Sequence, residues 1–117
     1  MGNPFTREAE ERARWTVQAA EVLCREAEAI AYACARARRD AIIVAVVEAD
    51  TSFSGAWAIP HTEMRERILQ LEDGEGKWVI AFAPLSSVDV IEKHCKEIAH
   101  MALRRAQAIR RRRNSYN

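Results

Sequence analysis

Hydrophobic residues in the first third of the chain recur at intervals of three and four positions. Such a spacing places them on one face of an amphipathic helix. Thr6 is a suitable N-cap residue for this helix, and no glycine or proline interrupts positions 6–54. We therefore predict one long helix over residues 6–38. Its apolar stripe consists of Trp15, Ala19, Val22, Leu23, Ala27, Ile30, Cys34 and Ala37.

The period of the pattern changes after Asp40. Residues 41–47 are continuously apolar and mostly β-branched, which is typical of a strand covered on both faces. Residues 78–83 have the same character, and residues 56–59 predict a short strand that ends at Pro60. The middle of the chain is therefore expected to form a small sheet of two to four strands.

Residues 62–72 fit two structures. As a helix, they have Thr62 as a cap, acidic residues in the first turn and Gly74 beyond the end. This interpretation, which we favour, predicts a crossover that joins parallel strands over 41–49 and 77–83. As a strand, the segment would pair with 77–83 in an antiparallel meander. The meander would leave one apolar sheet face bare, so it predicts a dimer through the sheet.

The last predicted helix begins near Ser86, which has the spacing of a capping box with Asp89. At 1.5 Å per residue, a helix of about 25 residues spans about 37 Å. It would thus outrun a small sheet and project its arginine-rich end. Its apolar stripe consists of Val88, Ile91, Cys95, Ile98, Ala99, Ala102, Ala106 and Ile109.

Together these elements predict the fold class α/β, with two long terminal helices packed on a small sheet and a short helix or extra strand at 62–72. A chain of 117 residues has the length of one domain. We assign residues 1–113 to this single domain. Residues 114–117 are expected to form a frayed tail.

The composition is typical of a compact domain rather than of a membrane or disordered chain. About half of the residues are hydrophobic, and the longest apolar run, 41–47, is too short to span a bilayer. The first residues lack the basic and apolar regions of a secretory signal. The cysteines, Cys24, Cys34 and Cys95, have no paired spacing. We therefore expect a cytoplasmic protein without disulfides, whose Cys34 and Cys95 are small core residues.

The net charge of +1 conceals an asymmetry along the chain. No acidic residue follows Glu97, whereas the last twenty positions carry six arginines. Cations near a helix C-terminus interact favourably with the helix dipole, but four consecutive arginines exceed that requirement. The cluster therefore predicts a contact with phosphates or with an acidic protein surface. Its members are Arg104, Arg105, Arg110, Arg111, Arg112 and Arg113.

A second candidate site is a ligand pocket in the connector between residues 50 and 63. The connector begins just past a buried strand, where open α/β sheets place their ligands. An acid, a hydroxyl and a histidine near one strand end can perform acid–base chemistry, and a tryptophan can stack on a ligand. The same residue types are also common in loops, because they form turns. The candidate pocket residues are Asp50, Thr51, Trp57, His61 and Glu63.

The remaining chemical motifs are weaker. His94, Glu97 and His100 lack the i,i+4 spacing of metal ligands on one helix, and no second helix supplies a matching pair. His94 and Cys95 are neighbours on a helix and diverge by about 100°, so they do not form a Cys–His pair. The segment 72–76 has acidic residues where a phosphate-binding loop has lysine. We therefore expect no metal and no cofactor, and we assign no catalytic residue.

These observations favour a small interaction protein over an enzyme. We expect it to act as an adaptor, subunit or inhibitor that binds another protein, without a membrane contact, and to form a homodimer through the long helices or the sheet. The alternative is an auxiliary nucleic-acid-binding protein that uses the C-terminal arginines. A third hypothesis is a small-ligand-binding protein built on the 50–63 pocket.

Overall fold

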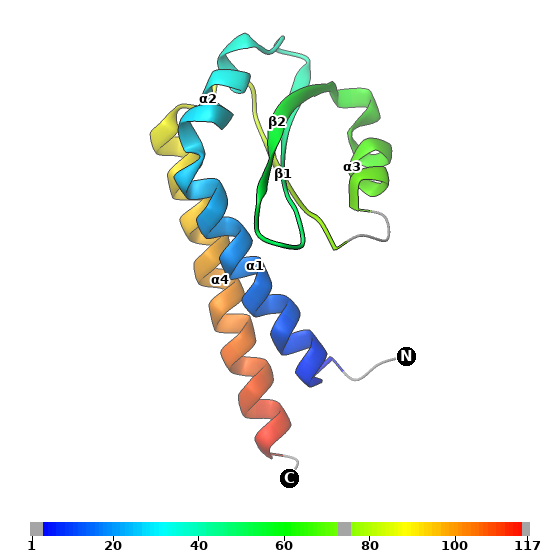
Figure 1. Cartoon of the computed structure of the whole chain (residues 1–117), viewed down its shortest axis with the longest axis vertical. Coiled ribbons are helices and arrows are strands. Elements are labelled where there is room, and N and C mark those ends of the chain that lie inside the picture. Colours follow the sequence, from blue (N-terminus) through cyan, green and yellow to red (C-terminus); the bar gives the residue numbers. More distant parts are fainter. Residues whose placement is uncertain (1–3, 73–75, 116–117) are drawn as a thin grey trace.

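The structure is a computed structural model, and it describes residues 4–72 and 76–115. Within these residues, α3 lies on one side of a sheet and the other helices lie on the opposite side (Figure 1). The predicted α/β class, with long terminal helices on a small sheet, is confirmed. The helices are α1 (Arg7–Arg25), α2 (Ala27–Arg36), the 3₁₀ turn η1 (His61–Glu63), α3 (Met64–Glu72) and α4 (Val88–Ser115). The strands are β1 (Ala41–Val47), β2 (Phe53–Pro60) and β3 (Trp78–Phe82).

The sheet has the strand order β2-β1-β3, and both neighbouring pairs are antiparallel. Ile43 in the central strand lies opposite Ala58 on one side and Phe82 on the other. The prediction of parallel strands over 41–49 and 77–83 is therefore wrong. The chain reverses direction in the β1–β2 hairpin before it enters α3, so the crossover joins β2 to β3. These two strands run parallel on either side of β1.

The segment between the hairpin and β3 is helical, as we favoured from the sequence. The predicted cap residue Thr62 lies inside the 3₁₀ turn η1 rather than at a cap position, and Gly74 lies outside the described residues. β2 is longer than predicted, because it begins at Phe53 rather than at residue 56. Gly55 has φ 141°, and the pairing register shifts between Val46 and Val47. Such irregularities interrupt the alternation by which a strand is recognised in a sequence.

The long helix predicted over residues 6–38 is interrupted at Glu26. This residue has φ −98° and ψ 17°, which ends α1 and starts α2 one residue later. The two halves pack on different partners, since α1 lies mainly against α4 whereas α2 lies against β2 and α4. The interruption therefore lets the second half follow the sheet. The predicted cap is confirmed: Thr6 Oγ1 accepts a hydrogen bond from Ala9 N at 3.1 Å.

The core lies between β1 and the helical layer. β1 is buried on both faces, as its continuous apolar run predicted. Ile43, Ala45 and Val47 face the helices, whereas the alternate residues Val44 and Val46 are buried on the side of α3. The helical residues of this core are Ala19, Val22, Leu23, Ala27, Ile30, Cys34, Ile91 and Cys95.

α1 and α4 form an antiparallel pair that extends beyond the sheet, so the arginine-rich end projects as expected (Figure 1). We refer to its free part, residues 7–14 and 102–115, as the stalk. Small side chains let the two helix backbones approach closely there. The buried alanines of the pair are Ala13, Ala19, Ala20, Ala102 and Ala106.

The end of α4 differs from the predicted frayed tail. The helix continues through Asn114 and Ser115, and Ser115 Oγ donates a hydrogen bond to Arg112 O at 2.9 Å. Positions 116 and 117 of that predicted tail lie outside the described residues. Among the helices that the structure describes, none combines the length and the apolar character needed to cross a membrane.

Candidate functional site

Within the described residues, the short strand β3 has a free edge that carries neither proline, charge nor bulge. Edge strands present unpaired N–H and C=O groups, which proteins block with proline, charge, bulges, a covering segment or a short strand length. On the opposite edge of the sheet, β2 has an irregular register, Pro60 at its end and α2 close by. β3 has no proline, charge or bulge between Trp78 and Phe82, where every residue is apolar.

The outer row of α4 runs beside this edge. The rings of His94 and Phe82 meet edge-on, with their centroids 5.5 Å apart, and a cavity of about 420 Å³ lies between the strand and the helix. Two large apolar side chains of the row are open to solvent, since Val90 is 55 % and Met101 70 % exposed. The β3 surface is our name for the free edge of β3 together with this row. The row consists of Val90, Lys93, His94, Glu97 and Met101.

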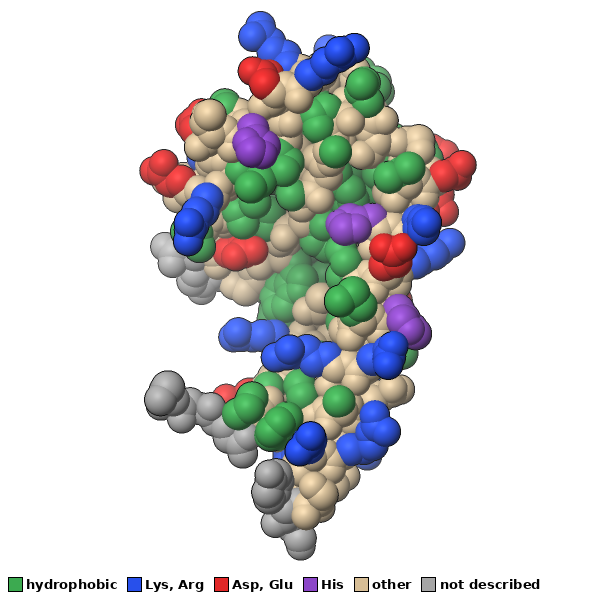
Figure 2. Space-filling view, turned by 180° about the vertical axis from the view of Figure 1, so that it is seen from behind, with side chains coloured by type: hydrophobic (Ala, Val, Ile, Leu, Met, Phe, Trp, Pro, Cys, Tyr) green, Lys and Arg blue, Asp and Glu red, His purple; other side chains and the backbone are tan. Residues whose placement is uncertain are grey.

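Figure 2 shows this side of the molecule. β3 passes behind β1 and β2 in Figure 1, so the reverse view in Figure 2 looks onto the free edge. Hydrophobic side chains gather over the broad upper part, and lysines and arginines gather over the narrow lower part. The β3 surface and the stalk therefore offer different chemistry to a partner.

The start of β3 is anchored to α1. The ring centroids of Trp15 and Trp78 lie 4.5 Å apart, and Trp78 Nε1 donates a hydrogen bond to Thr16 Oγ1 at 2.8 Å. A cavity of about 670 Å³ lies beside this pair. At the other end of β3, the contact between the rings of Phe82 and His94 holds the strand to α4. The free edge therefore belongs to a strand that is fixed at both ends.

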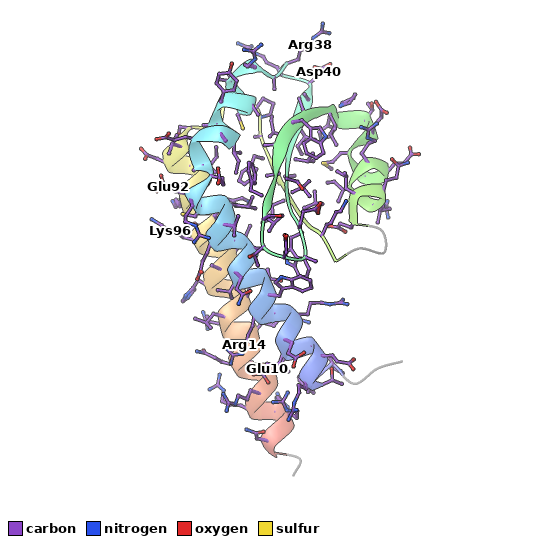
Figure 3. The ribbon with its side chains drawn as sticks, viewed as in Figure 1. Glu10, Arg14, Arg38, Asp40, Glu92 and Lys96 are labelled. Atoms are coloured by element: carbon purple, nitrogen blue, oxygen red, sulfur yellow. The ribbon has the colours of Figure 1, made fainter. Side chains whose placement is uncertain are left out.

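Two of the six C-terminal arginines hold α4 to the N-terminal part of the chain. Arg113 Nη2 lies 2.6 Å from Oε1 of Glu10, and Arg14 donates to the other carboxylate oxygen of Glu10 at 3.1 Å (Figure 3). Burial alone would raise the pKa of Glu10, but the hydrogen bonds from Arg113 and Arg14 bring it below its ordinary value of 4.5. The Arg112 guanidinium lies over the ring of Phe5, 5.7 Å from its centroid.

The other four arginines are open to solvent. They are exposed along the stalk, and they form no ion pair with the residues for which the structure gives a position. The stalk therefore presents a basic surface that suits a chain of phosphates. These residues are Arg104, Arg105, Arg110 and Arg111.

The structure does not bring the five candidate pocket residues together. Asp50 and Thr51 lie in the β1–β2 turn, whereas His61 and Glu63 follow the opposite end of β2. The N–H of His61 donates a hydrogen bond at 3.1 Å to the carbonyl that precedes β1, which fixes it at that far end. Trp57 lies in the middle of β2 and lines a separate cavity beside α2.

The polar residues of the β1–β2 turn serve the turn itself. The Asp50 carboxylate accepts hydrogen bonds from Ser52 N at 3.0 Å and from Ser52 Oγ at 2.5 Å. The Ser52 hydroxyl is the main cause that lowers the pKa of Asp50. Thr51 has φ 66°, a value that tight turns require. These contacts show that Asp50, Thr51 and Ser52 stabilise the turn between β1 and β2. Their presence in the sequence is therefore accounted for without a ligand.

Cys34 and Cys95 are buried in the core, as predicted. Burial raises the pKa of both thiols, and it raises that of Cys95 to about 11. Both side chains therefore act as small hydrophobic groups and not as thiolates. In the part of the chain that the structure describes, no three His, Cys, Asp or Glu side chains are placed to hold a metal ion.

Sequence reasoning did not identify the β3 surface. An apolar run does not reveal whether its strand is central or at an edge, because that depends on which strands pair. The usable signal was in the last helix, where Val90 and Met101 are large apolar residues outside the predicted buried stripe. Single exposed apolar residues are common on protein surfaces, so these two gain meaning only from their place beside the free edge of β3.

The described residues thus offer two candidate binding surfaces, the apolar β3 surface and the basic stalk. In comparisons with models of protein families, with curated proteins and with solved structures, the chain matched none.

Proposed function

We propose that this chain is a non-enzymatic interaction protein that binds a protein chain through the β3 surface. The observation that carries the proposal is the apolar, unblocked edge of β3 beside an exposed row of α4. An added strand would satisfy the free N–H and C=O groups of β3, and the α4 row supplies side-chain contacts next to it. In this role the protein acts as an adaptor, a subunit or an inhibitor.

Site-specific photo-crosslinking in the cells that produce the protein tests this proposal. The photoreactive analogue p-benzoylphenylalanine replaces Val90 in the α4 row, and in the control it replaces Glu28, which is exposed on α2. We expect irradiation to give a protein adduct from position 90, because a bound chain covers this residue. No adduct at position 90, or the same adducts from position 28, would contradict the proposal.

Nucleic-acid binding by the stalk is a second candidate function, and the four free arginines favour it. Their guanidinium groups would contact phosphates, so binding would tolerate different base sequences and weaken steeply with salt. The serine variant of these four residues keeps the Arg113–Glu10 contact. Truncation of the chain after Ile109 would remove that contact as well. A loss of nucleic-acid binding could then not be separated from a loss of stability.

We expect the fourfold serine variant to bind a labelled DNA duplex more weakly than the unaltered chain, as measured by fluorescence anisotropy at several salt concentrations. If all four arginines contact phosphates, the slope of log affinity against log salt should become less steep by about 3.6. A control variant loses the same charge elsewhere, including at Arg38, which lies far from the stalk (Figure 3). An equal loss in the control, or no binding by the unaltered chain at low salt, would exclude this function. The control replaces Arg38, Arg39, Arg65 and Arg67, all exposed, by serine.

A further inference from the structure

We infer that the chain bound by the β3 surface is a second copy of this protein, related to the first by a two-fold axis that relates the two β3 strands and the two α4 helices. The inference rests on the proposed function, because it names the chain that the β3 surface binds. A two-fold interface must be complementary to itself: where residue i meets residue j, residue j also meets residue i. Both parts of the β3 surface meet this condition.

The strand edges are self-complementary through their backbones. Two β3 strands that pair antiparallel about Ala81 place Ile80 of one copy near Phe82 of the other. All these residues are apolar, so no charge is buried by the pairing. The product is one antiparallel sheet in which β3 is no longer an edge and only the β2 strands remain at the outside. Those are the edges that the irregular register, Pro60 and α2 already block.

The same axis brings α4 against its counterpart. The ring contact of Phe82 with His94, and the cavity lined by both Ile80 and Ile98, set the stretch from Ile80 to Phe82 level with residues 94–98 of α4. An axis at that level makes the two α4 helices antiparallel neighbours on one face of the joined sheet. Positions equally far from the axis then face each other.

The outer row of α4 is complementary in this arrangement. Val90 of one copy lies opposite Met101 of the other, so each exposed apolar side chain covers another at both ends of the contact. Between them, Lys93 and His94 of one copy face Glu97 of the other, and the reverse contact occurs on the other side of the axis. Along α4, the basic residues Lys93 and His94 come before the acidic Glu97. In an antiparallel pair of identical helices, this order places opposite charges against each other.

A strand from a different protein would explain fewer of these features. It would form hydrogen bonds with the free N–H and C=O groups of β3, but it would not explain the symmetric order of apolar and charged residues on α4. A second copy explains the edge and the row by one contact. The prediction of a homodimer through the helices or the sheet thus acquires a specific interface that uses both.

Sedimentation equilibrium over a range of protein concentrations measures the self-association directly. We expect a species of twice the chain mass of 13.3 kDa. Lys93→Glu sets two glutamates against each other at both symmetric contacts, and Glu97→Lys sets two lysines there. Each single variant should weaken dimerisation at least about tenfold, whereas the double exchange restores opposite charges and should return to within about threefold of the unaltered protein.

Arg38→Glu and Glu28→Lys are the controls, since they make the same charge changes at exposed positions outside the β3 surface. Their dimerisation should equal that of the unaltered chain. A chain that stays monomeric at all concentrations would overturn the inference. So would a dimer that the single variants do not weaken or that the double exchange does not restore.

The crosslinking experiment separates this inference from the proposed function. An adduct of twice the chain mass from position 90 supports both. Adducts with other proteins only, formed by a chain that sediments as a monomer, would overturn the second copy as the partner and leave the proposed function standing. No adduct of any kind would contradict the proposed function itself.

Discussion

Replacement of Ile43 by alanine is expected to lower the free energy of unfolding by about 2–5 kcal/mol. Ile43 has no exposed surface, and it lies in the central strand with a neighbouring strand on each side. Its side chain packs in the core that the sheet shares with three helices. The truncation removes buried apolar groups and leaves a cavity, which strands held on both sides cannot easily close.

Urea or thermal unfolding followed by circular dichroism measures this loss, and the midpoint temperature should fall by roughly 10 °C. Protein concentration must be the same for all variants, because dimer formation would itself change the apparent stability. Leu69→Ala is the control, since Leu69 on α3 is 61 % exposed and its truncation should cost less than about 0.5 kcal/mol. Similar losses at the two positions would contradict a core centred on β1.

The elements of this fold whose environment is uniform along their length were predictable from the sequence. β1 is apolar at every position because both of its faces are covered, whereas a strand with one face in water would alternate apolar and polar residues. α3 has a weak apolar face, yet its strong helix formers and its charge pattern were sufficient to favour a helix, although Thr62 does not cap it. In both cases, the information lies within one short stretch of the chain.

Strand direction was not predictable in the same way. The chain turns back between β1 and the predicted strand over 56–59, so the helix that follows carries the chain to β3 from this second strand and not from β1. Gly55 and the register shift disguise the first residues of β2, so the predicted strand over 56–59 was too short to identify as a full partner of β1. The predicted crossover therefore began at the wrong strand, although the helices and strands themselves were placed nearly correctly.

The candidate sites show the same limit. The arginine cluster was evident from the sequence, but Arg113 is bound by Glu10, a residue more than one hundred positions earlier. No local pattern separates such a structural arginine from Arg111, which is free to bind a partner. The candidate pocket was inferred from neighbours in the sequence, whereas β2 places Asp50 and His61 at its opposite ends.

Ala106→Leu is expected to destabilise the protein by about 1–3 kcal/mol, although it adds only apolar atoms. Ala106 is fully buried on α4. α1 and α4 pack against each other along the stalk, and both Ala106 and Ala13 are buried in that contact. Small buried side chains allow close approach of the backbones, so a leucine at position 106 must push the helices apart or adopt a strained rotamer.

Ala108→Leu is the matched control, because it makes the same substitution two residues further along on the exposed side of α4. Leucine and alanine are both good helix formers, so this variant should stay within about 0.5 kcal/mol of the unaltered protein. Leucine at position 106 should also weaken the Arg113–Glu10 contact, so that Arg113→Ala costs less in the Ala106→Leu protein than in the unaltered one. Equal effects of leucine at 106 and 108 would contradict close packing of the stalk. Because the free arginines are carried by the same part of α4, close packing of this helix pair also fixes the backbone positions from which they extend into solvent.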